Sequence, residues 1–209
     1  MAIVISTWNV KGSNNVVKKS QMMNITNTVE NGLVKFFSSY STNKRGFITL
    51  IHKNLSFTVT ATHKDNEGRY ILVKGMLNGE TVLLDNIYAP NAQDDEFYTV
   101  LFSQLVVMDC ANIILAGDFN CVLCPKMDQL PPQSTLTKNS KALWQIVNEL
   151  DLMGVWRHYN PLSKEYTFHS NPHLSASRID YIFITLSLLD EKCIHFITEQ
   201  TTLFLEILL

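Results

Sequence analysis

The chain has 209 residues, a length typical of one domain or of two small ones. Hydrophobic residues make up 46% of it and charged residues 17%, which excludes a disordered chain and leaves enough apolar material for a sizeable core. The net charge of -2 gives no field that would draw the chain to nucleic acid or to an anionic membrane, so nucleic-acid binding would need a local basic patch.

Targeting signals bear on the cellular location of the protein, and the cysteines bear on metal binding. No segment is apolar over a bilayer-spanning length, and the start MAIVIS lacks the features of a signal peptide, so we expect an intracellular protein without a membrane partner. Cys121 and Cys124 form a Cys-x-x-Cys pair, but a zinc site needs a second ligand pair and none stands nearby. Incidental reduced thiols are the expected interpretation.

The first part of the chain is rich in β-branched residues, which predicts a run of strands. The expected strands are Ala2–Thr7, Leu33–Tyr40, Gly46–Ile51, Phe57–Thr62, Arg69–Met76 and Thr81–Tyr88. The Asn78-Gly79 pair between the last two predicts a tight hairpin. Residues 16–31 show only the weak spacing of an amphipathic helix.

The second part of the chain alternates helical and extended patterns. We expect helices at Asp94–Val107 and Lys138–Leu150, strands at Ile113–Ala116 and Ile179–Ile184, a loop at Pro125–Pro132, short edge strands at Val155–Tyr159 and Tyr166–His169, and an apolar tail without an evident partner at Leu203–Leu209. Many strands with few helices between them favour antiparallel or mixed sheets in a single α/β domain over residues 1–209.

Polar residues follow four of the apolar runs. Asn9 follows the first run, Tyr88 and Asn91 end another, Asp118 and Asn120 follow IILAG, and Asp180 begins the run DYIFI. Any one of these endings fits a turn, because Asp and Asn side chains bond their own backbone. Four of them together predict that one rim of a sheet sandwich carries converging polar groups.

Seven motifs stand in an order that matches a known family. They are TWNVKG around Asn9, Arg45-Gly46, Gly68-Arg69-Tyr70, NIYAPN at 86–91, GDFN at 117–120, Tyr166-Thr167-Phe168 and Arg178-Ile179-Asp180-Tyr181. Over nearly its whole length the chain resembles the endonuclease/exonuclease/phosphatase superfamily. It is most similar to the apurinic-endonuclease-like domain of non-LTR (LINE-type) retrotransposons.

The resemblance implies a DNase I-like fold, a four-layer sandwich of two mixed β-sheets flanked by helices. It also implies Mg²⁺-dependent hydrolysis of a DNA phosphodiester. We expect the chain to be a monomer. The implied catalytic residues are Asp118, Asn120, Tyr88, Asp180 and Asn91, the implied metal-site residues are Asn9 and Asp118, and the implied residues of the DNA face or its support are Arg69, Arg178 and Thr167.

These residue types suit the implied reaction. By the resemblance, Asp118 orients or deprotonates the attacking water, and Asn120 and Asn91 hold the phosphate, while Tyr88 supports the phosphate or the leaving group and Asp180 pairs with a catalytic histidine. Amide and hydroxyl donors stabilise the charge that gathers on phosphate oxygens without adding a competing anion. A carboxylate activates water, and a divalent cation offsets the leaving-group charge.

Two elements of the family pattern have no counterpart in this sequence. The Gln-Glu-Thr-His-like stretch, whose glutamate is the family's principal metal ligand, is missing from residues 13–44, where Glu30 is the only acid. The closing Ser-Asp-His, which supplies the histidine, is also missing, and His195 is the only histidine after Asp180. The chain diverges from the family pattern at about residues 197–209.

The gaps leave several functions open. We expect a degenerate copy with impaired or no nuclease activity and a weak or lost Mg²⁺ site, and the alternative is a non-catalytic remnant that binds nucleic acid or another chain, or nothing. An active phosphodiesterase with a relocated metal ligand, or a phosphatase of inositol lipids or sphingolipids, is a further possibility. With few basic residues, DNA binding should be weak and sensitive to salt.

Overall fold

The computed structural model describes the backbone at residues 2–8, 33–41, 45–52, 56–190, 193–199 and 202–208, and the side chains of residues 56–188. Asn9, Glu30 and the weak helix expected at 16–31 lie outside the described residues. So does the side chain of His195, whose backbone belongs to a strand.

The larger sheet has six strands. In spatial order they are β4 (Phe57–Lys64), β5 (Tyr70–Leu77), β6 (Glu80–Tyr88), β7 (Asn112–Asp118), β12 (Asp180–Thr185) and β9 (Leu152–Gly154). Only β6 and β7 pair in parallel, so the sheet is mixed. The Asn78-Gly79 hairpin between β5 and β6 is confirmed, with both residues at positive φ.

The second sheet has five strands, all paired antiparallel. In order they are β13 (Cys193–Glu199), β14 (Thr202–Leu208), β1 (Ala2–Trp8), β3 (Arg45–His52) and β2 (Leu33–Ser41). The expectation that Leu203–Leu209 has no partner is therefore wrong, because β14 lies between β1 and β13. Its apolar side-chain pattern fits a central strand better than a surface tail.

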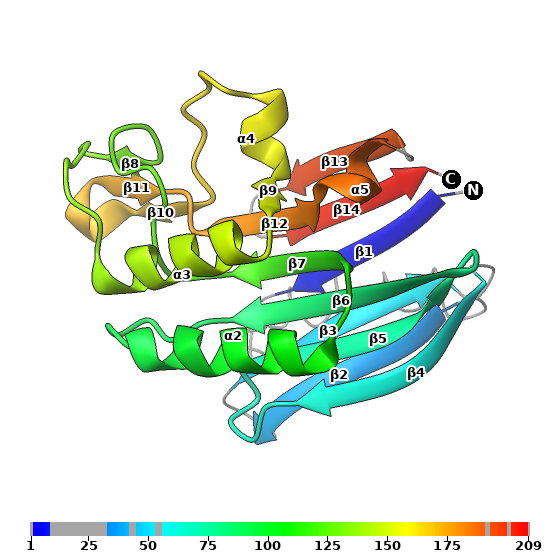
Figure 1. Cartoon of the computed structure of the whole chain (residues 1–209). Helices are drawn as coiled ribbons and strands as arrows, with labels where there is room; N and C mark the ends of the chain where they lie inside the picture. The colour runs from blue at the N-terminus through cyan, green and yellow to red at the C-terminus, as the bar shows by residue number, and fades with distance from the viewer. Residues whose placement is uncertain are drawn as a thin grey trace.

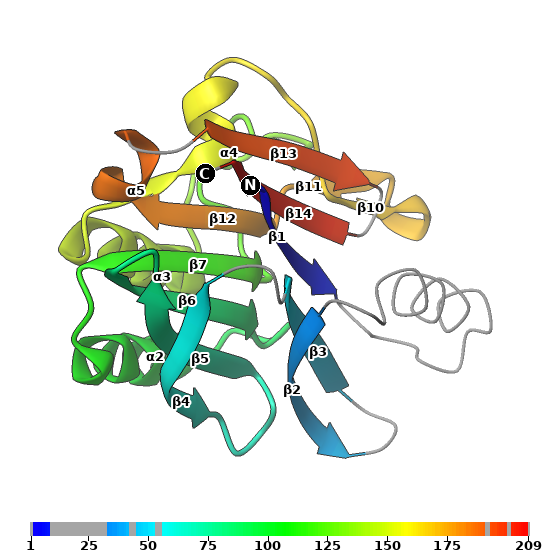
Figure 2. The same ribbon diagram turned by 90° about the vertical axis from the view of Figure 1, so that its right-hand side faces the viewer.

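The two sheets pack face to face (Figure 2). Contacts join β1 to β7, β3 to β6 and β14 to β12. Strands β1, β6 and β7 run in the same direction, so their carboxyl ends lie at one end of the sandwich, where the antiparallel β12 begins (Figures 1 and 2). A short three-stranded sheet, β10-β11-β8, lies at this same end.

Two helices cover the outer face of the larger sheet (Figure 1). Helix α2 (Asp95–Met108) begins after Asp94, whose side chain accepts a hydrogen bond from the Phe97 backbone N–H, and α3 (Lys138–Glu149) begins after Thr137, which accepts from Ser140. These caps satisfy amide groups that the first helical turn leaves unpaired. Both helices were predicted from their sequence pattern to within one or two residues.

The remaining elements are short. They are β8 (Gln129–Leu130), α4 (Val155–Tyr159), β10 (Phe168–Ser170), a 3₁₀ turn (Asn171–His173), β11 (Ser175–Ser177) and α5 (Leu186–Asp190). The prediction of an edge strand at Val155–Tyr159 is wrong, because these residues form α4. Five residues with one buried apolar side chain carry too little periodicity to distinguish a helical turn from a strand. The expected loop at Pro125–Pro132 contains the two residues of β8.

Side chains of the larger sheet alternate between two cores. On β6, Leu83 and Ile87 belong to the core under the helices, whereas Val82 and Leu84 belong to the core on the face towards the second sheet. This period of two assigns every residue of β6 and its neighbours to one face or the other. Among the described residues, no helix is long and apolar enough to cross a membrane.

Candidate active site

Three of the expected site residues form a row across neighbouring strands. Tyr88 on β6 pairs with Asp118 on β7, and Asp118 pairs with Asp180 on β12. Directly paired residues point to the same face of a sheet, here the face towards the second sheet. The row lies at the end of the sandwich where β6 and β7 finish, so the predicted convergence of these three residues is observed.

The turn after β7 fixes the position of Asp118. Gly117 has φ 141°, and a Cβ on it would lie 2.0 Å from the carbonyl oxygen of Ile87 on β6, so only glycine fits. Asn120 adopts the left-handed conformation, with φ 46°, which Asn tolerates better than most residues. Its backbone N–H donates to Asp118 Oδ1 at 2.9 Å, so the turn holds one oxygen of the carboxylate.

Two amides lie beside this row. The Asn120 side chain donates through Nδ2 to the carbonyl of Ala89 at 2.7 Å, which ties the GDFN turn to the end of β6. Asn91 is exposed, and its Oδ1 accepts a long, 3.4 Å hydrogen bond from the Tyr88 hydroxyl. The structure therefore places Tyr88, Asn91, Asp118 and Asn120 around one strand end.

A buried tyrosine supports the GDFN turn from the helix side. Tyr98 on α2 donates its hydroxyl to the carbonyl of Phe119, and Phe119 itself is fully buried. The backbone N–H of Phe119 donates to the carbonyl of Ile179 at 2.8 Å, just before β12. Phe119, the residue after Asp118, is therefore held by α2 and by the segment that leads into β12, and this fixes the turn from which Asp118 projects.

Asp180 has a pKa well above that of a free carboxyl. Burial, followed by the charge of the neighbouring Asp118, raises the pKa of Asp180 to about 7, while a hydrogen bond with the Thr167 side chain and the charge of Arg178 act in the opposite direction. Thr167 Oγ1 also accepts from the backbone N–H groups of Ile179 and Asp180, at 3.1 and 3.2 Å. Two carboxylates held side by side repel each other, and a cation between them would relieve this.

Arg178 is not placed to contact DNA directly. It is 3% exposed, its Nη2 donates to the carbonyl of Glu165 at 2.6 Å, and its guanidinium stacks on the Trp156 ring at 3.4 Å. Asp128, also buried, bonds Arg157 and lies 3.9 Å from Arg178 Nε. Arg178 and Thr167 are therefore positioned to support the segment that leads into Asp180.

The backbone of Arg69 is hydrogen-bonded to Tyr88, the first residue of the row. Its carbonyl accepts from the Tyr88 N–H at 2.7 Å, while its Nε donates to Glu67 at 3.0 Å. The side chain is half-buried, so it retains some access to solvent.

Two polar residues near the site carried no predicted role. Asn86 is 2% exposed and precedes Tyr88 by two residues, so it points to the same face. The alternation of β6 was a usable signal for it. Asp128 lies in the predicted loop at Pro125–Pro132, and nothing in the local sequence distinguishes it from a solvated acid.

The described residues offer a small donor set for a metal. Among residues 56–188, no group of three or more His, Cys, Asp or Glu side chains is arranged to hold an ion. The carboxylates of Asp118 and Asp180 are adjacent, and Mg²⁺ is commonly held by one or two carboxylates while it keeps several waters. The residues present therefore fit a weak Mg²⁺ site.

Among the described residues, the Cys-x-x-Cys pair belongs to no group of three or more potential metal ligands. Cys121 is buried, and burial raises the pKa of its thiol to about 11, whereas Cys124 lies at the wall of a separate pocket.

Comparison with known proteins identifies the family. The model of the Endonuclease/Exonuclease/phosphatase family matches residues 6–200. The chain belongs to this family. A curated relative is the transposon TX1 uncharacterized 149 kDa protein of Xenopus laevis, 26% identical over 159 residues. That match covers 74% of this chain, and the chain spans only 12% of the length of the relative.

Solved endonuclease structures share the fold. The AP endonuclease LMAP of Leishmania major superposes with a TM-score of 0.72 at 14% identity, covering 98% of this chain and 87% of that one. The endonuclease domain of TRAS1, a telomere-specific non-LTR retrotransposon, gives 0.64 at 12% identity, covering 94% of each chain. An AP endonuclease of Archaeoglobus fulgidus gives 0.63 at 17% identity, covering 98% and 88%. The DNase I-like fold and the family resemblance predicted from the sequence are confirmed.

Proposed function

We propose that this chain is a phosphodiester-hydrolase domain of the retrotransposon endonuclease kind whose hydrolytic site is impaired. The row of Tyr88, Asp118 and Asp180, with Asn120 fixed beside it, is the observation that carries this proposal. A transposon protein among the relatives and a retrotransposon endonuclease domain among the similar structures support DNA as the substrate.

The residues of the row have distinct chemical roles. Asp118, with one oxygen held by the Asn120 N–H, would orient or deprotonate a water that attacks phosphorus. The Asn120 amide uses one N–H on Ala89 and has a second for a phosphate oxygen, and Asn91 is exposed beside it. Tyr88 has a hydroxyl whose present bond to Asn91, at 3.4 Å, is long enough to exchange for a phosphate oxygen.

Asp118 and Asp180 would hold the divalent cation. When bound, Mg²⁺ supplies Lewis acidity that offsets negative charge on the phosphate. The raised pKa of Asp180 means that this carboxyl keeps its proton to a higher pH than a free carboxyl does. Because a protonated carboxyl binds cations poorly, Mg²⁺ binding should strengthen as pH rises through 7.

The impairment follows from what this donor set lacks. Two carboxylates make a weaker site than three, and the family glutamate and histidine have no counterpart in the sequence. We therefore expect a DNA-nicking rate well below that of an intact enzyme, with the loss of positioned acid–base groups costing roughly 10²–10⁴-fold.

The test is nicking of supercoiled plasmid with and without Mg²⁺. The chain is compared with Asp118→Ala and with Asp95→Ala, which removes an exposed acid from the first turn of α2. Weak Mg²⁺-dependent nicking that only Asp118→Ala abolishes is the expected result. Fast nicking would overturn the impairment, and nicking that survives in Asp118→Ala would overturn the site assignment.

A second candidate function is non-catalytic binding of nucleic acid. It is favoured by the absence of a three-residue metal cluster from the described part of the chain. Titration of labelled DNA at rising salt distinguishes the two, because this candidate predicts binding without any nicking. Affinity should fall steeply with salt.

A further inference from the structure

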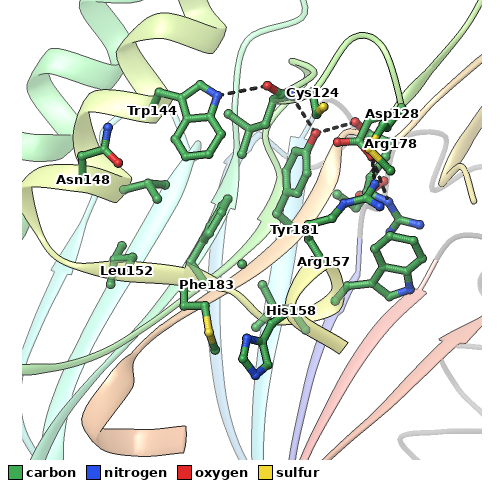
Figure 3. A pocket seen from close by; sticks show the side chains of 18 of the residues that line it. Cys124, Asp128, Trp144, Asn148, Leu152, Arg157, His158, Arg178, Tyr181 and Phe183 are labelled. Atoms are coloured by element: carbon green, nitrogen blue, oxygen red, sulfur yellow. Dashed lines mark hydrogen bonds and ion pairs between the residues drawn. The ribbon is translucent and has the colours of Figure 1, made fainter. Parts of the chain in front are cut away.

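A pocket of about 680 Å³ lies along the outer edge of β12, on the side away from β7 (Figure 3). The pairing of β12 with β9 ends at Phe183–Gly154, so the stretch from Asp180 to Ile182 has no strand partner on this side. Residues of α3, β9 and α4 complete the walls. Of the row of Tyr88, Asp118 and Asp180, only Asp180 also lines the pocket.

The surface that the pocket offers to a ligand is mostly apolar. Trp144 on α3 is 37% exposed and Leu186 at the start of α5 is 55% exposed, so both present carbon surface to a molecule in the pocket. Half-buried Met127, Met153 and Trp156 line it further in. Methionine side chains adapt to the shape of a ring. Pockets of this size and lining accommodate small ring-bearing molecules.

Polar groups in the pocket wall are already bonded within the protein. The indole N–H of Trp144 donates to the carbonyl of Leu123 at 3.0 Å, so this side chain offers a ring face rather than a donor. The Tyr181 hydroxyl donates to the carbonyl of Arg178 at 2.7 Å and accepts from the Leu123 N–H at 3.0 Å. A ligand therefore gains most of its binding free energy here from apolar surface that leaves water.

The charges of the pocket do not favour an ionised ligand of either sign. The arginines Arg157 and Arg178 line it together with the acids Asp128, Asp151 and Asp180. Asp128 is bonded to Arg157, and Asp151 is exposed, where water screens its charge. An ionised group on a ligand would lose hydration on entering and would meet charges of both signs, which costs free energy without a matching gain.

We propose that this pocket binds a small, uncharged, ring-bearing compound. The rings lie against Trp144 and the apolar side chains between α3 and α4. Four elements supply the walls, and the enclosed volume matches a small molecule better than a strand or helix of a partner chain. The pocket takes this ligand whether or not the domain hydrolyses DNA.

Calorimetric titration with three naphthalene probes tests the preference for an uncharged ligand. The probes share one ring system: 2-naphthylmethanol is neutral, 2-naphthoate is an anion and 2-naphthylmethylammonium is a cation. We expect the neutral probe to bind at least about tenfold more tightly than either ion, because only the ions lose the hydration of a charge. Equal or tighter binding of either ion, or no binding of 2-naphthylmethanol up to its solubility limit, would overturn the proposal.

Gly154→Val tests the location. Gly154 lines the pocket at φ -74°, which any residue adopts, and a Cβ there would meet the Phe183 ring at 3.5 Å, an ordinary contact. The larger side chain should take up space in the pocket and weaken binding of 2-naphthylmethanol at least about tenfold. Thr99→Val, on the exposed side of α2, is the control and should bind as the unmodified chain does. Unchanged binding in Gly154→Val would contradict this location.

Thiol alkylation gives a second readout that needs no variant. Cys124 lines the pocket and is half-buried, whereas Cys110 is also half-buried but lies outside the pocket. Saturating 2-naphthylmethanol should slow the reaction of Cys124 with iodoacetamide, followed by peptide mass spectrometry, and leave Cys110 unaffected. Protection of neither thiol, or equal protection of both, would overturn the proposal.

Discussion

The two faces of the larger sheet each hold buried carboxylates, and their surroundings differ. On the face towards the second sheet, Asp118 is 9% exposed and accepts from the Asn120 N–H at the end of its strand. On the face under the helices, Asp85 is 4% exposed in the middle of β6, between Leu72 and Leu115, and neither of its oxygens has a hydrogen-bond partner.

The difference shows what distinguishes a carboxylate in a functional site from a buried carboxylate without hydrogen-bond partners. A carboxylate at a strand end has turn amides and solvent to offset the loss of hydration, whereas one in mid-strand among leucines has neither. Burial alone raises the pKa of Asp85 well above its ordinary value, because a buried carboxyl is more stable neutral than charged. Asp85 therefore costs stability without contributing to the row of Tyr88, Asp118 and Asp180.

The largest expected effect on stability comes from disturbing the close contact between Gly117 on β7 and Ile87 on β6, which aligns this row. Gly117→Ala would place a methyl group 2.0 Å from the Ile87 carbonyl oxygen at a positive φ. We expect the free energy of unfolding in urea to fall by about 4 kcal/mol or more. Gly79→Ala is the control, because a Cβ there meets nothing within 4 Å, and it should cost only about 1 kcal/mol. Equal losses in the two variants would contradict the steric explanation.

Replacing Asp85 by an apolar residue should stabilise the protein. Asp85→Val removes the unpartnered carboxyl and adds a β-branched side chain to a strand, and should raise the free energy of unfolding by about 2–3 kcal/mol at neutral pH. The folded-state pKa of Asp85 is raised, so its penalty grows as pH rises above the unfolded-state value of 3.8. Urea unfolding at pH 4 and pH 8 should show the larger gain at pH 8, and a loss of stability would contradict the assignment.

A smaller gain in unfolding free energy is expected from replacing Asp180, which lies on the opposite face of the sheet. Because the pKa of Asp180 is raised to about 7, its contribution is most favourable below pH 3.8 and is lost as pH rises to 7. Asp180→Asn removes the repulsion with Asp118 and should add on the order of 2 kcal/mol at pH 8 and almost nothing at pH 4. The same variant should weaken Mg²⁺ binding, measured by calorimetry, which Asp85→Val should not do. Equal effects of the two variants on Mg²⁺ would erase the contrast between the faces.

The smallest effect concerns the support of Asp180. Thr167→Val removes the oxygen that accepts from the Ile179 and Asp180 amides, at a cost of about 1–2 kcal/mol in unfolding free energy. It also removes a hydrogen bond that lowers the pKa of Asp180, so this pKa should rise in a carbon-13 NMR titration. Thr99→Val should leave the titration unchanged, and a fall in the Asp180 pKa would contradict the role of Thr167.

Long periodic segments and turn signals were sufficient to predict most elements from the sequence. The helices at α2 and α3, the Asn78-Gly79 hairpin and the strands that end at Tyr88 and Asp118 all carry such signals. The strand ends were also sufficient to predict that Tyr88, Asp118 and Asp180 converge. Short or non-local features were not predictable. Helix α4 has too few residues to show a helical period, and the partner of β14 is β1, which lies at the other end of the sequence.

The side-chain environment was the least predictable level. Arg178 stands in a family motif, and nothing in its local sequence shows that it stacks on Trp156 and shares Asp128 with Arg157. These partners come from segments separated by 20 residues or more, so only the tertiary structure brings them together. Asp85 is a similar case, since its isolation depends on the residues of β5, β7 and α2.

The pairing of β14 with β1 also constrains how the domain is made. The two strands meet along seven residues, Ala2 against Leu208 through Trp8 against Thr202, although nearly the whole chain separates them. During synthesis β1 is made long before β14, and the centre of its sheet can close only once β14 is present, so folding of this sheet is slow. Until then β1 presents an open edge, and a nascent chain would need protection from aggregation for that interval.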